Sequence, residues 1–106
     1  MKKKFLLCLC FLFLGSFVHA AQDPNRAATL FKQCAGCHGA DGQNKAFGKS
    51  GIIAGQSADD LIESLTFFKE SDFKTHSSTT VMAKQVKNLT DQDIIDLAHF
   101  ISKLKK

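Results

Sequence analysis

The sequence contains no tryptophan and no tyrosine among its 106 residues, and its only proline is Pro24. Its aromatic residues other than histidine are all phenylalanines, which absorb only weakly in the near ultraviolet. Strong absorbance of the protein in that region would therefore have to come from a bound cofactor. This absence provides a cheap test for a coloured prosthetic group.

Long hydrophobic runs are also missing. The apolar run at residues 5–14 is shorter than the about 20 residues that a membrane-spanning helix needs. It follows three lysines and precedes the small-residue sequence Val18-His19-Ala20, an order typical of a secretory signal peptide. We therefore expect residues 1–20 to be a signal peptide, removed together with Cys8 and Cys10, and residues 21–106 to form one domain. An uncleaved membrane anchor is the alternative.

Neither sign of charge dominates residues 21–106. Three of the fourteen basic residues lie at positions 2–4, and none of the ten acidic residues precedes Asp23. Eleven basic and ten acidic residues therefore remain after residue 20. This balance removes the support that the overall net charge of +4 would give to a nucleic-acid-binding function.

Cysteine is scarce after residue 20, where only Cys34 and Cys37 occur, in the sequence Cys-Ala-Gly-Cys-His ending at His38. One disulfide between them would close a very short loop and add little stability. A small exported domain usually needs a disulfide, a metal or a cofactor to hold it together. Three kinds of site compete for this motif: a disulfide, a zinc ion and a covalently attached haem.

The patterning predicts an all-α domain with three main helices and no convincing strand. The first is expected at about residues 25–32, the second after a cap at Ser57 and the last after a cap at Thr90. Apolar residues recur at helical spacing in the last two, at Leu61, Leu65, Phe68, Ile94, Leu97, Ala98, Ile101 and Leu104. Residues 72–88 are polar and irregular, with at most a turn of helix at residues 82–86. The glycine-rich stretch of about 20 residues that follows Cys37 is too long for a compact domain unless it wraps around something.

Disulfide and zinc chemistry each leave part of the motif unexplained. A thioredoxin-like pair needs a strand–helix–strand setting, and a disulfide gives His38 no role. Zinc needs four ligands, so Cys34, Cys37 and His38 would require His76 or His99 as the fourth. Adjacent Cys37 and His38 fit one tetrahedral ion poorly, and the sequence has no second C-x-x-C.

A haem uses the whole motif, because C-x-x-C-H is the attachment pattern of c-type haem. Cys34 and Cys37 would form thioethers with the vinyl groups, and His38 would bind the iron from one face. Met82 is the only methionine besides Met1, and a Met/His pair is typical of electron-transferring cytochromes. Alternatively, Met82 is core filler and His76 is the sixth ligand.

Four stretches resemble those of class I c-type cytochromes: CAGCHGADG, IIAGQSADDL, VMAKQVKNLTDQDI and LAHFISKL. The resemblance is to the single-haem c553 type and to one half of the dihaem c4 type. It implies a compact fold around one covalent haem c, with the first and last helices crossing near Phe31 and Phe100. It also implies a periplasmic one-electron carrier rather than an enzyme. Such a monomer would dock transiently on respiratory partners, such as a quinol-oxidising complex and a terminal oxidase or peroxidase.

One position departs from the family pattern. Gly51 stands where the family usually has a proline, whose carbonyl accepts a hydrogen bond from the haem-ligating histidine. The Gly51 carbonyl is expected to accept that bond from His38, since such bonds orient metal-ligating imidazoles. Without the proline ring, we predict a more mobile loop at residues 48–51.

Two other classes of function compete with an electron carrier. A gas sensor or haem peroxidase needs an open sixth position at the iron, which ligation by Met82 would close. A structural protein or metal chaperone would hold no covalent haem. For the carrier, the lysines Lys45, Lys49, Lys84 and Lys87 are expected to surround the haem edge and attract acidic partners, although lysines on solvated helix faces are common.

Overall fold

The computed structural model describes residues 23–48, 50–71 and 78–106. Within these ranges the chain forms helices α1 (Pro24–His38), α2 (Ala58–Glu70), α3 (Ser78–Val86) and α4 (Asp91–Ser102), and a 3-10 turn, η2 (Ala46–Gly48). None of the described residues lies in a strand. The predicted all-α class is therefore confirmed.

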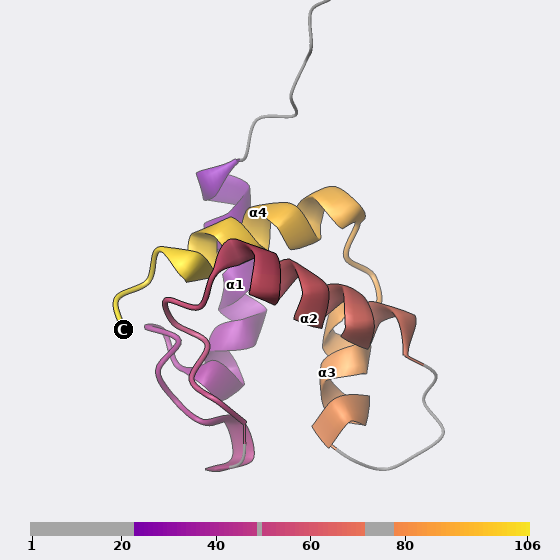
Figure 1. Cartoon of the computed structure of the whole chain (residues 1–106), viewed down its shortest axis with the longest axis horizontal. Helices are drawn as coiled ribbons and strands as arrows, with labels where there is room; N and C mark the ends of the chain where they lie inside the picture. Colours follow the sequence, from indigo (N-terminus) through magenta and orange to yellow (C-terminus); the bar gives the residue numbers. More distant parts are fainter. Residues whose placement is uncertain (1–22, 49, 72–77) are drawn as a thin grey trace, which may run out of the picture.

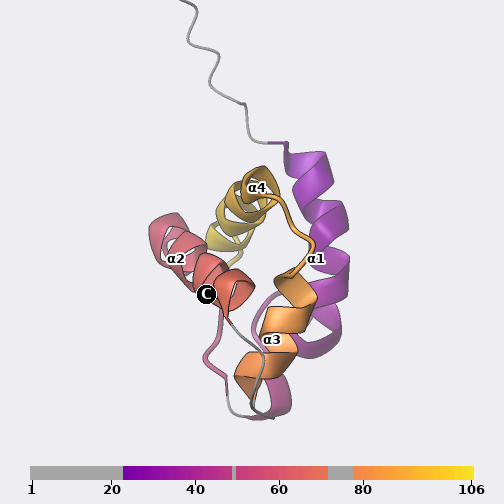
Figure 2. The ribbon, with the colours of Figure 1, turned by 90° about the vertical axis from the view of Figure 1, so that its right-hand side faces the viewer.

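Helix α4 lies across α1 and also packs along α2, while α3 packs on α2 (Figures 1 and 2). At the crossing of α1 and α4, the rings of Phe31 and Phe100 have centroids 5.4 Å apart and are tilted by 46°. This confirms the expected crossing of the first and last helices. Helices α1 and α3 are not packed along each other, which leaves space between them.

The core follows the helical spacing seen in the sequence. Leu61 and Leu65 of α2 are buried against the α4 side chains Ile94, Leu97, Ala98 and Ile101. Each of these four α4 side chains is at most 2% exposed. The apolar stripe of α4 is thus the centre of the core, on which α1 and α2 both rest.

Helix α1 is longer than the sequence predicted. It was expected to end near Lys32 but continues to His38, with the C-cap at Gly39. Gly36 within it lowers helix propensity, and the glycines beyond it suggested an earlier end. Burial of Phe31 and His38 compensates for this weak local preference and extends the helix through the C-x-x-C-H motif.

Helix α3 was also underestimated, since at most a turn of helix was expected around Met82. The helix has nine residues, although the β-branched residues Thr79, Thr80 and Val81 favour helices only weakly. Ala83 and Val86 are 0% and 2% exposed and face the rest of the core. Tertiary packing therefore overrides the local preference, and the described residues hold four α-helices rather than three.

The glycine-rich segment is held by a hydrogen bond within itself and by another to α4. The Ala54 amide donates to the Gly42 carbonyl over 3.0 Å, and the Gly55 amide donates to the Ile101 carbonyl of α4 over 3.1 Å. Gly55 has a φ of +75°, and a Cβ there would collide with Lys106. The segment is thus folded back onto α4, as a loop that wraps around a site requires.

Both predicted N-caps are present. The Ser57 hydroxyl accepts from the Asp60 amide over 3.1 Å, and Thr90 and Asp93 form a reciprocal capping box at the start of α4. Asp93 is buried and also accepts a 2.7 Å hydrogen bond from the Arg26 guanidinium of α1. This ion pair joins the starts of the two crossing helices and lowers the pKa of Asp93 below its usual range, with hydrogen bonds from Thr90 adding to the effect.

Asp93→Asn is expected to lower the free energy of unfolding at pH 7 by about 1 kcal/mol, the usual scale of a lost cap. Because folding lowers the pKa of Asp93, its contribution is fully present above about pH 4 and is lost as pH falls through the folded-state pKa. The free energies of unfolding of wild type and variant, measured by urea titration, should therefore differ at pH 7 and converge toward pH 2. Asp91→Asn is the control, because the Asp91 side chain is 95% exposed. A difference between wild type and Asp93→Asn that stays constant with pH would contradict the prediction.

Candidate functional site

Helix α1 presents three of the predicted site residues on one face. Cys37 lies three positions after Cys34, and His38 lies four positions after it. Residues at these spacings are neighbours on a helix surface. Cys34 is half-buried, Cys37 is exposed and His38 is only 6% exposed. The extension of α1 to His38 is what gives the motif this geometry.

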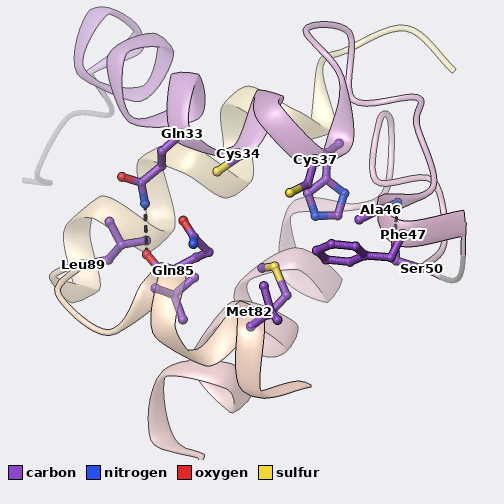
Figure 3. Close-up of a pocket in the computed structure, with 12 residues that line it drawn as sticks. Gln33, Cys34, Cys37, Ala46, Phe47, Ser50, Met82, Gln85 and Leu89 are labelled. Carbon is purple, nitrogen blue, oxygen red and sulfur yellow. Dashed lines mark hydrogen bonds between the residues drawn. The ribbon is translucent and has the colours of Figure 1, made fainter. Parts of the chain in front are cut away.

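Met82 on α3 lies opposite these residues, across a cavity of about 100 Å³. Figure 3 shows the Met82 side chain pointing into the same space as Cys34 and Cys37. A second cavity, toward α2 and α4, is also lined by Cys34, His38 and Met82. We call these two adjoining cavities the cleft. The structure thus brings all four predicted site residues to one place.

The walls of the cleft are mostly apolar. The side chains of Val81, Val86 and Leu89 line its outer part, and those of Leu61, Leu65, Phe68, Leu97 and Ile101 line its inner part. A large apolar cofactor that meets a few convergent ligands fits such a lining. This is also the space that the glycine-rich loop was expected to enclose.

The Nδ1 atom of His38 is buried and has no hydrogen-bond partner among the described residues. The expected bond to the Gly51 carbonyl is therefore not formed, and this prediction is wrong for this structure. The Gly51 carbonyl instead accepts from the Ser50 hydroxyl over 3.2 Å. An unsatisfied buried nitrogen is costly, so the protein's own hydrogen bonds do not account for the burial of His38. Lys49 lies outside the described residues, and the mobility of this loop stays a prediction.

The protonation states of the motif favour haem over thiol redox chemistry. Burial raises the pKa of the Cys34 thiol to about 11, with a smaller contribution from neighbouring Cys37. Reactive redox cysteines instead have a lowered pKa. Burial lowers the pKa of His38, which keeps the imidazole neutral at pH 7, the form that binds a metal.

The competing sites receive no support from the geometry. Cys34 and Cys37 are not joined by a disulfide. No group of three or more His, Cys, Asp or Glu side chains in the described ranges is placed to hold a metal ion. His99 lines a different cavity, beside Asp96 and Lys103. His76, the rival sixth ligand, lies outside the described residues.

Two residues of the site were not found from the sequence. Phe47 of η2 is 64% exposed and lines the cleft, and it has a positive φ of 55°. Gln33 precedes Cys34 and reaches across the cleft to α3. Phe47 is an aromatic residue between loop glycines, which is a weak sequence indication of a site residue. Gln33 is a polar residue on an exposed helix face, and nothing in the sequence indicated a role for it in the site.

An all-helical domain with a C-x-x-C-H helix facing a methionine across an apolar cleft defines a class I c-type cytochrome. The sequence model of the family described as cytochrome c matches residues 25–105. This chain belongs to the cytochrome c family. The family carries covalently bound haem c, and Cys34 and Cys37 have the spacing that its attachment requires. Membership in the family supports an electron-carrier role.

Named relatives agree with this assignment. Cytochrome c-553 of Nitratidesulfovibrio vulgaris is 37% identical over 87 residues, which cover 82% of this chain and 83% of the relative. Cytochrome c-553 of Helicobacter pylori is 42% identical over 76 residues, covering 72% of this chain and 75% of the relative. Cytochrome c4 of Pseudomonas aeruginosa is 32% identical, and the match covers 99% of this chain but 50% of that protein. The expected likeness to the c553 and c4 types is confirmed.

Helices long and apolar enough to cross a bilayer do not occur among the residues that the structure describes.

Proposed function

We propose that this protein is a one-electron carrier with a single haem c, held through thioethers by Cys34 and Cys37. His38 and Met82 would supply the two protein ligands of the iron. The observation that supports this most directly is that α1 and α3, which do not pack along each other, present these four side chains to one apolar cleft. When bound, the haem supplies the ferric–ferrous couple.

Each residue has a defined task in this proposal. Cys34 and Cys37 fix one edge of the cofactor to α1, and Cys37, which is exposed, marks the side on which partners can approach. His38 supplies a neutral nitrogen from a buried position. The Met82 thioether raises the reduction potential relative to a second imidazole. The apolar walls exclude water, which also tunes the potential.

The cellular setting belongs to the same proposal. Residues 1–20 act as a signal peptide, and residues 21–106 work in the periplasm as a monomeric electron carrier without enzymatic activity. Its partners are respiratory proteins, such as a quinol-oxidising complex and a terminal oxidase or peroxidase, and the complexes are short-lived. The support comes from the charged and apolar start of the sequence and from membership in the cytochrome c family.

The visible spectrum of the exported protein tests the proposal directly. The protein is produced in a host that matures c-type haem and is recorded oxidised, reduced, and reduced with carbon monoxide. A sharp reduced α-band, a weak far-red ferric band from sulfur ligation and no carbon monoxide shift are expected. A carbon monoxide shift without the far-red band would instead favour the gas sensor or peroxidase.

Lysines near the cleft are expected to speed electron transfer with acidic partners. Lys45 directly precedes η2, Lys84 lies on α3 and Lys87 follows α3, and Lys45 and Lys84 are exposed. Residues of η2 and α3 line the cleft. Lys49 lies outside the described residues. Reversal of Lys84 or Lys87 to glutamate should slow reduction by an acidic redox protein several-fold at low salt, because steering raises association rates.

Stopped-flow reduction over a series of salt concentrations measures this effect. Lys103→Glu is the matched control, because Lys103 lines a separate cavity beside Asp96 and His99. Wild-type and variant rates should converge at high salt, where surface charges are screened. Rates that do not depend on salt in the wild type would contradict the steering model.

A further inference from the structure

A hydrogen bond joins the two helices that face each other across the cleft. The side-chain amide of Gln33 on α1 donates to the backbone carbonyl of Gln85 on α3 over 2.9 Å. The two residues are 52 positions apart in the sequence. Figure 3 shows this bond spanning the outer edge of the cleft, next to Cys34 and Leu89.

The bond satisfies a backbone group that the helix itself leaves unpaired. The last four carbonyls of an α-helix have no intrahelical partner, and Gln85 is the next-to-last residue of α3. The final carbonyl, that of Val86, accepts from the Leu89 amide over 3.1 Å. Gln33 therefore caps one of the C-terminal carbonyls of α3 from a different helix.

Helix α3 depends on few contacts for its position relative to α1. It packs on α2, and its side chains Ala83 and Val86 are buried, whereas α1 packs on α4. The Gln33 bond thus ties α3 directly to the helix that bears the C-x-x-C-H motif. It acts at the C-terminal end of α3, where Gln85 lines the outer part of the cleft.

Met82 lies one helical turn before Gln85, at a spacing that places both on one helix face, and both line the cleft. We propose that Gln33 is a positioning residue, which holds the end of α3 so that Met82 stays in place to bind the haem iron. This inference rests on the proposed ligation by Met82. It explains why a polar side chain beside the thioether cysteine points across the cleft rather than into solvent.

Competition between Met82 and added imidazole tests the inference in the ferric holoprotein. Gln33→Ala is expected to bind imidazole about two- to tenfold more tightly than wild type, the range that one lost hydrogen bond produces. The far-red ferric band reports the displacement of the methionine. Gln33→Glu, whose ionised side chain cannot donate to a carbonyl, should behave like Gln33→Ala. Gln33→Lys keeps a donor of similar reach and should restore most of the wild-type resistance to imidazole.

Gln43→Ala is the matched control. The Gln43 side chain also donates to a backbone carbonyl, that of Lys105, over 2.7 Å, but it does not touch α3. Equal imidazole affinity in wild type and Gln33→Ala would overturn the positioning role, as would an equal increase in Gln43→Ala. A wild-type protein without the far-red band would overturn Met82 ligation itself, so the two failures are distinguishable.

Discussion

Replacing Cys34 and Cys37 together with alanine is expected to abolish covalent haem attachment completely. No other cysteine follows residue 20, so no thioether can form in the exported domain. Haem that is not covalently attached leaves the polypeptide on denaturing gel electrophoresis. Haem staining of that gel measures the effect as a lost band.

The same double variant is expected to lose most of its folded structure. Apolar side chains of α2, α3 and α4 line the cleft, and a domain of this size buries too little surface to tolerate an empty cleft in its centre. Circular dichroism should show a large loss of helix relative to the holoprotein.

Replacement of Cys8 and Cys10 with alanine is the matched control for haem attachment. Both cysteines lie in the proposed signal peptide, so the variant should stain for haem like the wild type. Persistent haem staining of the Cys34→Ala, Cys37→Ala protein would contradict covalent attachment through the C-x-x-C-H motif.

Replacing Met82 with alanine is expected to turn the carrier into a protein that binds carbon monoxide when reduced. The sixth position at the iron would lose its thioether, and Val81 and Gln85, which also line this part of the cleft, offer no comparable ligand. The reduction potential should fall by on the order of 0.1 V or more, given that axial ligands span about 0.8 V. Visible spectra and a redox titration measure both changes.

Val81→Ala is the control for Met82→Ala. Val81 lines the same cavity but provides no ligand atom, so its variant should keep the far-red band and resist carbon monoxide. A Met82→Ala protein that also keeps both properties would show that another side chain binds the iron. His76 would then be the first residue to replace.

The sequence predicted local features well, because their causes lie within a few residues. The caps at Ser57 and Thr90, the apolar spacing of α2 and α4 and the motif from Cys34 to His38 each depend on side chains within one or two helical turns. The structure confirms these caps and this spacing. The fold class followed from the same patterns.

Features that depend on distant parts of the chain were predicted less well. The end of α1 and the full length of α3 were missed, because local propensity at Gly36 and at Thr79 to Val81 disfavours a helix. Burial of His38 in one helix and of Ala83 in the other decided both cases. The expected bond from His38 to the Gly51 carbonyl needs the end of α1 and the following loop to meet, and it is not formed in the structure.

The sequence by itself determined the chemistry that this protein can offer: two thiols and an imidazole at haem-attachment spacing, and one methionine in the domain to oppose them. Only the tertiary structure decided that Met82 faces the same cleft as His38. It also decided that the Gln33 side chain caps α3 by donating to the Gln85 carbonyl, 52 positions away in the sequence. The physical reason is that α3 has little helical preference of its own. Its position is set by packing on α2 and by the bond to α1, which form only when the whole domain folds.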